Sequence, residues 1–191
     1  MEKTAAPAEE VIVNDRSVEN PLVVETIGRG GVMLDIGCLG SEYLGEMATR
    51  ADRAYGLDIQ QAPAVEGVQI VRGDVANPPL KPGSFDVIIS ISAIEHIGCA
   101  FYGQIPSEDA DLIAMRQIRR LLRDKGRLLI SVPYGRGITY AWFRVYNCCS
   151  HTIPCWWDDT THRYAVGTPA DGTFVNGGEL MRVVSIIGEV S

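Results

Sequence analysis

Three aspartates close or follow short apolar runs in the first half of the chain. They are Asp35 in "VMLDIG" at 32–37, Asp58 in "RAYGLDI" at 53–59 and Asp74 in "VQIVRGD" at 68–74. If these runs are parallel strands, their carboxyl ends meet at one edge of a sheet, and the three carboxylates share a crevice. An acid closing the second run can accept from both vicinal hydroxyls of a ribose. An acid after the third run can accept from the amino group of an adenine, so the spacing predicts a nucleoside-binding crevice.

The elements that would hold these acids follow from the rest of the pattern. Two more runs, at 85–92 and 126–133, are continuously apolar, which is typical of strands covered on both faces of a parallel sheet. The segment 41–51 has apolar residues at helical spacing, with Ser41 placed to cap its start. The segment 107–126 begins with acids and ends with bases, as the helix dipole favours. This alternation predicts an α/β fold, a doubly wound and mostly parallel sheet.

The two ends of the chain have a different character. Residues 1–18 are rich in Ala, Pro and Glu and predict a flexible tail, followed by a single domain over 19–191. Near the other end, 160–166 and 172–175 can pair as an antiparallel hairpin at one edge of the sheet. The N-terminus does not have the pattern of a secretion signal, and no apolar stretch is long enough to span a membrane. We therefore expect a cytoplasmic protein.

The charge of the chain bears on its partners. The formal net charge is −7, which argues against binding along a nucleic acid backbone. The basic cluster that could suggest such binding is interpreted instead as the solvated end of the helix over 107–126. Its members are Arg119, Arg120, Arg123 and Lys125. Nucleic acid is therefore not expected as a partner.

The turn after the first apolar run contains few glycines. Gly37 and Gly40 are present, but Leu39 and Ser41 stand where a phosphate-binding loop would carry more glycine. A dinucleotide brings a pyrophosphate, which requires several backbone N–H groups in a glycine-dense turn. S-adenosyl-L-methionine has an adenine and a ribose without phosphate, and its sulfonium and ammonium suit an acidic crevice. The turn therefore favours this cofactor over NAD.

Taken together, the motifs resemble those of the class I S-adenosylmethionine-dependent methyltransferases, in their small-molecule type 11 form. The matching segments are "VMLDIGC" at 32–38, "AYGLDI" at 54–59, "VRGDVANPPLKPGSFDVIISISAIEHIG" at 71–98 and "IRRLLRDKGRLLISVPYG" at 118–135. The resemblance covers about residues 30–135 in the family's order. It implies a Rossmann-like methyltransferase fold with a seven-stranded sheet, S-adenosyl-L-methionine as cofactor, and transfer of a methyl group to a small-molecule or glycan-like acceptor.

The resemblance also implies roles for individual residues. By this resemblance, the methionine end of the cofactor is bound by Asp35, Gly37 and Cys38. The ribose is bound by Asp58, with Ile59 beside it. The adenine is bordered by Asp74 and Val75. The segment 90–96, which contains Ser92, borders the sulfonium and the acceptor. Where the family usually has glycine in the first motif, this chain has Leu39 and Ser41.

Catalysis needs little from the protein beyond positioning, because the sulfonium is already a good leaving group. A base helps if the acceptor is a hydroxyl, and "IEHIG" offers His96, with Glu95 beside it, for that role. The alternative is structural: His96 anchors its loop by hydrogen bonds while Glu95 caps a short helix. Both interpretations stay open at this point.

Other features allow other interpretations. The segment "CCSHTIPCWWDDTTH" at 148–162 could suggest zinc, but it lacks paired C-x-x-C spacing, and we expect no metal site. The aromatic residues after the fifth apolar run could roof an acceptor pocket or could simply pack on the sheet. They are Tyr134, Tyr140, Trp142, Trp156 and Trp157. Two rival functions remain, a non-catalytic partner subunit with the same fold and a nicotinamide-dependent oxidoreductase.

Overall fold

The computed structural model describes residues 16–100, 102–134, 139, 141–146, 165–167 and 182–189. Their core is a seven-stranded sheet with the order β3-β2-β1-β4-β5-β7-β6. The strands are β1 (Val32–Ile36), β2 (Arg53–Asp58), β3 (Val68–Arg72), β4 (Phe85–Ile91), β5 (Leu122–Tyr134), β6 (Ala165–Gly167) and β7 (Arg182–Glu189). The predicted α/β class and seven-stranded, mostly parallel sheet are confirmed.

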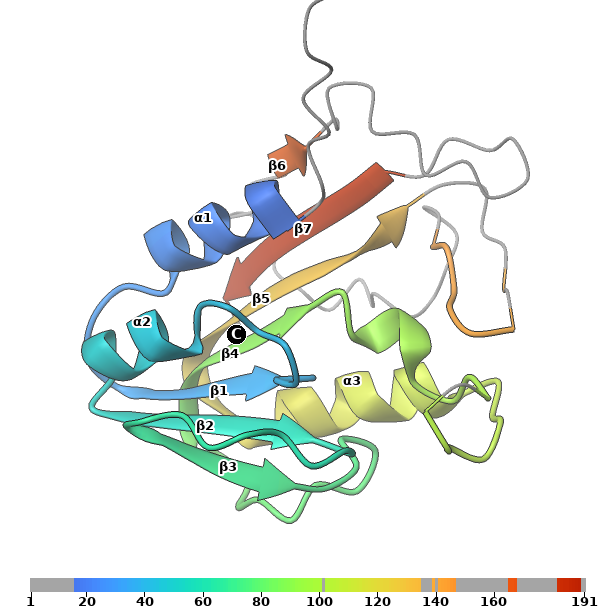
Figure 1. Cartoon of the computed structure of the whole chain (residues 1–191), viewed down its shortest axis with the longest axis horizontal. Coiled ribbons are helices and arrows are strands. Elements are labelled where there is room, and N and C mark those ends of the chain that lie inside the picture. Colours follow the sequence, from blue (N-terminus) through green and yellow to red (C-terminus); the bar gives the residue numbers. More distant parts are fainter. Residues whose placement is uncertain are drawn as a thin grey trace, which may run out of the picture.

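The pairing explains the continuous apolar runs. The strands β1 to β5 pair in parallel, and β7 runs antiparallel to both β5 and β6. The helices α1 (Arg16–Thr26) and α2 (Leu44–Arg50) cover one face of the sheet, and α3 (Ala110–Leu121) covers the other (Figure 1). Each central strand therefore buries side chains on both faces, and alternation of polar residues is lost.

Alternation along β1 shows how the two faces are filled. Leu34 and Ile36 belong to the core under α3, whereas Met33 belongs to the core under α1 and α2. Asp35 follows Met33 at the strand period of two and so projects to the same face as Met33. The sheet order reverses between β1 and β4, where the crevice beyond the strand ends is expected to hold the ligand.

The structure corrects the predicted ends of the helices. Ser41 does not cap α2, because the helix begins at Leu44 after Tyr43, which makes no side-chain capping bond. The helix predicted over 107–126 ends at Leu121. Beyond it Arg123 pairs with Asp86 at 2.6 Å, so part of the basic cluster neutralises a carboxylate of β4. Only Arg119 and Arg120 of that cluster lie in the last turn of α3.

The two ends of the chain also differ from the prediction. Residues 16–18, predicted in the tail, belong to α1, and residues 1–15 lie outside the described part. At the far edge of the sheet β6 pairs in antiparallel fashion with β7, and the segment 172–175 of the predicted hairpin lies outside the described residues. Within the described residues, no helix is long and apolar enough to cross a membrane.

A short 3₁₀ helix, η1 (Ile94–His96), follows β4 and is braced from several sides. The buried guanidinium of Arg144 donates to the backbone oxygens of Ile97 and Ser107, the latter at 2.9 Å. It lies 3.8 Å from the carboxylate of Asp111, which also accepts from the Tyr146 hydroxyl at 3.0 Å. This buried polar network joins the segment after β5 to α3 and to the loop after η1.

Candidate functional site

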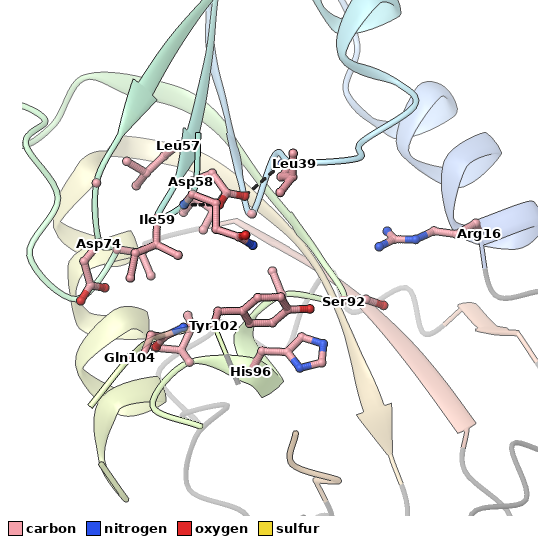
Figure 2. Close-up of a pocket in the computed structure, with 17 residues that line it drawn as sticks. Arg16, Leu39, Leu57, Asp58, Ile59, Asp74, Ser92, His96, Tyr102 and Gln104 are labelled. Carbon is pink, nitrogen blue, oxygen red and sulfur yellow. Dashed lines mark hydrogen bonds between the residues drawn. The ribbon is translucent and has the colours of Figure 1, made fainter. Parts of the chain in front are cut away.

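A cavity of about 220 Å³ opens beyond the carboxyl ends of β1, β2, β3 and β4. Its lining combines acidic, aromatic and apolar side chains with one arginine (Figure 2). The lining residues are Arg16, Ile36, Gly37, Leu39, Leu57, Asp58, Ile59, Gln60, Gly73, Asp74, Val75, Ser92, Ala93, His96, Ile97, Tyr102 and Gln104. The cavity therefore lies at the edge of the sheet where the sequence predicted a binding crevice.

Most of the predicted site residues meet in this cavity, and three do not. The residues that line it are Gly37, Asp58, Ile59, Asp74, Val75, Ser92 and His96. Asp35, Cys38 and Glu95 are almost completely buried and do not line it. The three aspartates therefore do not share the crevice, because Asp35 lies within β1 rather than beyond its end.

Asp58 ties the loop after β1 to the end of β2. Its side chain is only 8 % exposed, and its carboxylate accepts from the backbone N–H of Leu39 at 3.0 Å and of Gln60 at 2.8 Å. Asp74 is more open, and its carboxylate accepts from the N–H of Ala76 at 2.8 Å. These bonds hold both carboxylates at one wall of the cavity, where Figure 2 shows them on the same side.

The loop after β1 already uses most of its backbone donors. The N–H groups of Gly37 and Cys38 bond to the carbonyl of Leu57, at 2.9 and 3.4 Å, and that of Ser41 bonds to the carbonyl of Cys38 at 3.1 Å. Leu39 donates to Asp58. A pyrophosphate would need such groups free and clustered. The loop thus fits a ligand without phosphate, and this argues against a nicotinamide dinucleotide.

The missing glycines do not distort this loop. Positive φ falls on Gly37 (φ +76°) and Gly40 (φ +86°), whereas Leu39 and Ser41 avoid that region. A Cβ at Gly37 would come within 2.6 Å of the Cβ of Ala93, so this position also needs glycine for space. The glycines that the turn requires are therefore present, and Leu39 contributes a 42 % exposed side chain to the cavity wall.

His96 is held in one tautomer by the segment after β5. Its Nδ1 lies 2.7 Å from the carbonyl oxygen of Trp142, which can only accept, so Nδ1 carries the hydrogen and Nε2 the lone pair. Burial lowers the pKa of His96 below its ordinary 6.5, and nearby Arg16 lowers it further, against the opposing Trp142 carbonyl. Nε2 lies 3.8 Å from Oε1 of Glu95. The imidazole is neutral at neutral pH and can accept a proton.

Aromatic rings surround His96. Trp142 stacks on its ring, with centroids 5.5 Å apart and planes inclined by 16°, and Tyr102 meets it edge-on at 5.5 Å. Both aromatic side chains are partly exposed, at 42 % and 38 %. Of the aromatic residues predicted to roof the pocket or pack on the sheet, Trp142 is therefore beside His96. The side chain of Tyr134 is not described, and Tyr140, Trp156 and Trp157 lie outside the described residues.

Sequence reasoning missed Arg16, which reaches the cavity from α1, because residues 1–18 were assigned to a tail. The available signal was the spacing of Val23 and Ile27, both fully buried and four residues apart. The possible zinc ligands between 148 and 162 lie outside the described residues. Elsewhere in the described chain, no three side chains of His, Cys, Asp or Glu come together as a metal site would require.

Comparison with known proteins adds independent findings. A family model described as "Methyltransferase domain" matches residues 34–130, just over half of the chain. A candidate methyltransferase of Encephalitozoon cuniculi (strain GB-M1) is 32% identical over 105 residues, which cover 54% of this chain and 46% of that protein. The tRNA (carboxymethyluridine(34)-5-O)-methyltransferase alkbh8 of Xenopus tropicalis is 30% identical over 112 residues, 56% of this chain and 16% of its own.

These matches limit what can be carried over. The chain spans less than half the length of both curated relatives. Because one of them is named for methylation of a tRNA, the expected exclusion of nucleic acid is not supported.

A solved structure of the Burkholderia thailandensis 1,6-didemethyltoxoflavin-N1-methyltransferase, with 1,6-didemethyltoxoflavin and S-adenosylhomocysteine bound, has a TM-score of 0.66 at 16% identity. That match covers 90% of this chain and 76% of the other, and it shows the shared fold.

Asp35 yields a prediction about stability and pH. Burial raises the pKa of Asp35 to about 7, against the lowering effect of the hydroxyls of Ser41 and Tyr43; the Tyr43 hydroxyl donates to Asp35 at 2.7 Å. In the unfolded chain the group titrates near 3.8, so folding binds a proton between these two pH values. The free energy of unfolding therefore decreases as pH rises through this window and is level above it.

We expect Asp35→Asn to remove this dependence, because the amide oxygen still accepts from Tyr43 while the buried charge is lost. Between pH 5 and pH 8 the ligand-free wild type should lose about 2–3 kcal/mol of unfolding free energy relative to the variant. Urea titrations of both proteins at the two pH values measure this difference. Equal losses in the two proteins would contradict the assignment.

Proposed function

The chain belongs to the methyltransferase domain family, as its sequence motifs indicated, and from that premise we propose that it transfers a methyl group from S-adenosyl-L-methionine to a small-molecule or glycan-like acceptor. The observation that carries this proposal is the single cavity that Asp58, Asp74, Gly37 and His96 all line. We further propose that the reaction takes place in the cytoplasm.

The residues around the cavity suit each part of this cofactor. Asp58, oriented by two backbone N–H groups, would bind the ribose hydroxyls, and Asp74 with Val75 would border the adenine. Gly37 lets the backbone approach the methionine part closely. The bound cofactor supplies an activated methyl group whose leaving group is a neutral thioether. The chain has to orient the acceptor in line with it and exclude water.

His96 would take the proton of a hydroxyl or amine acceptor. Its Nε2 carries the lone pair because Nδ1 donates to Trp142, and the lowered pKa keeps the ring unprotonated at neutral pH. Glu95, 3.8 Å from Nε2, would act as a positioning residue that also stabilises the imidazolium once it forms. Tyr102 and Trp142, exposed beside His96, give the acceptor apolar faces on which a sugar or a flat ring can stack.

A tRNA nucleotide is the second candidate acceptor. The relative named as a tRNA methyltransferase supports it, and a nucleobase can stack on the same exposed aromatic rings. The net charge of −7 favours the small-molecule or glycan acceptor, since tRNA binding by this chain alone would need a basic surface.

The proposed function leads to three predictions, of which the first concerns the cofactor. Asp58→Ala should weaken binding of S-adenosylhomocysteine by at least about tenfold, because the ribose hydroxyls lose the carboxylate to which they would donate. Asp52→Ala is the matched control, since Asp52 also accepts from a backbone N–H, that of Gly31 at 2.8 Å, but does not line the cavity. Calorimetric titration measures both. Equal affinity in all three proteins would contradict the role of Asp58.

The second prediction concerns proton transfer. His96→Ala should lower kcat by about 10²–10⁴-fold while the affinity for S-adenosylhomocysteine stays the same. Because the pKa of His96 is lowered from 6.5, wild-type kcat/KM should decrease as pH falls, with a midpoint below 6.5. A variant that keeps wild-type turnover would leave His96 with a structural role only.

The third prediction separates the acceptors. With a radiolabelled methyl donor, we expect label in small-molecule or glycan fractions and none in a tRNA fraction that ribonuclease digests. Label that ribonuclease releases would replace the first acceptor class with the second. If the donor binds and no fraction is labelled, the chain is better described as a non-catalytic partner subunit.

A further inference from the structure

The first turn of α1 brings a positive charge to the cavity. Arg16 is the first residue of the helix, and its side chain lines the cavity while remaining 41 % exposed. Figure 2 shows its guanidinium directed toward the cavity from the side opposite Asp74, with Ser92 lying nearer to Arg16 than to Asp74. The acidic and basic ends of the cavity are therefore well separated.

Glu19, one turn further along α1, explains how this arginine is placed. The carboxylate is only 1 % exposed, and its Oε1 accepts from the hydroxyls of Ser131 at 2.5 Å and Ser92 at 3.0 Å. Its Oε2 lies 3.7 Å from the guanidinium of Arg16. A buried carboxylate is costly unless it is satisfied, so these contacts give Glu19 one position. They attach α1 to the carboxyl ends of β4 and β5.

The same contacts reach the cavity wall through Ser92. This residue has φ +48°, which is unusual for a residue other than glycine, and it lies directly after β4. Its N–H donates to the carbonyl and to the hydroxyl of Ser131, at 3.1 and 3.0 Å. Glu19 therefore connects an uncommon backbone conformation at the cavity to the helix that carries Arg16.

The charges along the cavity indicate which part of a ligand Arg16 meets. Asp58 and Asp74 line the nucleoside end, and the lowered pKa of His96 keeps its ring neutral, so Arg16 is the cationic side chain among the described lining residues. S-adenosyl-L-methionine has its carboxylate at the end of the molecule opposite the adenine. A guanidinium binds a carboxylate through two parallel hydrogen bonds.

We propose that Arg16 is a carboxylate subsite for the amino-acid part of the methyl donor, and that Glu19 is the positioning residue that places it there. This inference rests on the proposed function, because it takes the donor to be the ligand of the cavity. It makes α1 part of the binding site and not merely a cover of the sheet.

Two ligands that differ in the amino-acid part test the subsite. S-adenosylhomocysteine contains the carboxylate, and 5′-methylthioadenosine lacks the whole amino-acid group. We expect Arg16→Gln to bind the first about ten- to a hundredfold more weakly and the second within about threefold of wild type. Arg29→Gln, at an exposed arginine just beyond α1, is the control and should bind both ligands normally. Calorimetry measures all affinities, and thermal unfolding checks that each variant is folded.

Double substitution tests the positioning role. Glu19→Gln keeps an oxygen that accepts from Ser92 and Ser131 but removes the charge beside Arg16. It should reduce the affinity for S-adenosylhomocysteine less than Arg16→Gln does. The double variant should bind S-adenosylhomocysteine no more weakly than Arg16→Gln alone. Glu25→Gln, exposed on the same helix, should have no effect. Fully additive losses would overturn the positioning role of Glu19.

The outcomes separate this inference from the proposed function. Suppose that wild type binds both ligands, and that Arg16→Gln either reduces the two affinities equally or leaves both unchanged. The carboxylate subsite is then wrong and the cofactor assignment stands. A raised KM for the acceptor with unchanged S-adenosylhomocysteine affinity would equally overturn it. If folded wild type binds neither ligand, the cofactor assignment fails and the subsite fails with it.

Discussion

The carboxylate of Asp58 is the interaction on which the site depends. It joins the end of β2 to the loop after β1 by accepting from Leu39, and it holds the next loop by accepting from Gln60. The loop after β1 then bonds mostly within the protein, so it does not offer the cluster of free N–H groups that a pyrophosphate needs. One buried acid thus shapes the cavity and limits the ligands that suit it.

A second buried acid assembles the opposite end. Glu19 comes from the first helix, yet its partners Ser92 and Ser131 follow or lie in strands far along the chain. A buried ionic contact of this kind is weak evidence for stability, but together with its hydrogen bonds it fixes the position of α1 against the sheet. α1 therefore contributes to the cavity as well as to the core, where Val23 and Ile27 pack.

Between these ends, the tautomer and orientation of His96 depend on contacts made by residues after β5. The carbonyl of Trp142 selects its tautomer, and Arg144, two residues later, is held by Asp111 and by the backbone beyond η1. Tyr146 donates to the same aspartate. The orientation of the imidazole is thus set by a buried network that joins α3, η1 and the segment after β5, and this network makes a well-defined proton acceptor possible.

The sequence alone determined the α/β class, the approximate strands and the cavity residues Gly37, Asp58 and His96, because apolar runs and the short motifs at and after their ends are local signals. Only the tertiary structure decided which way Asp35 points and that Ser41 faces that carboxylate instead of capping α2. It also decided that Arg16 lines the cavity and that Glu19 contacts Ser92 and Ser131. A polar first turn resembles a tail in sequence, and its contacts with β4 and β5 exist only after the sheet has formed.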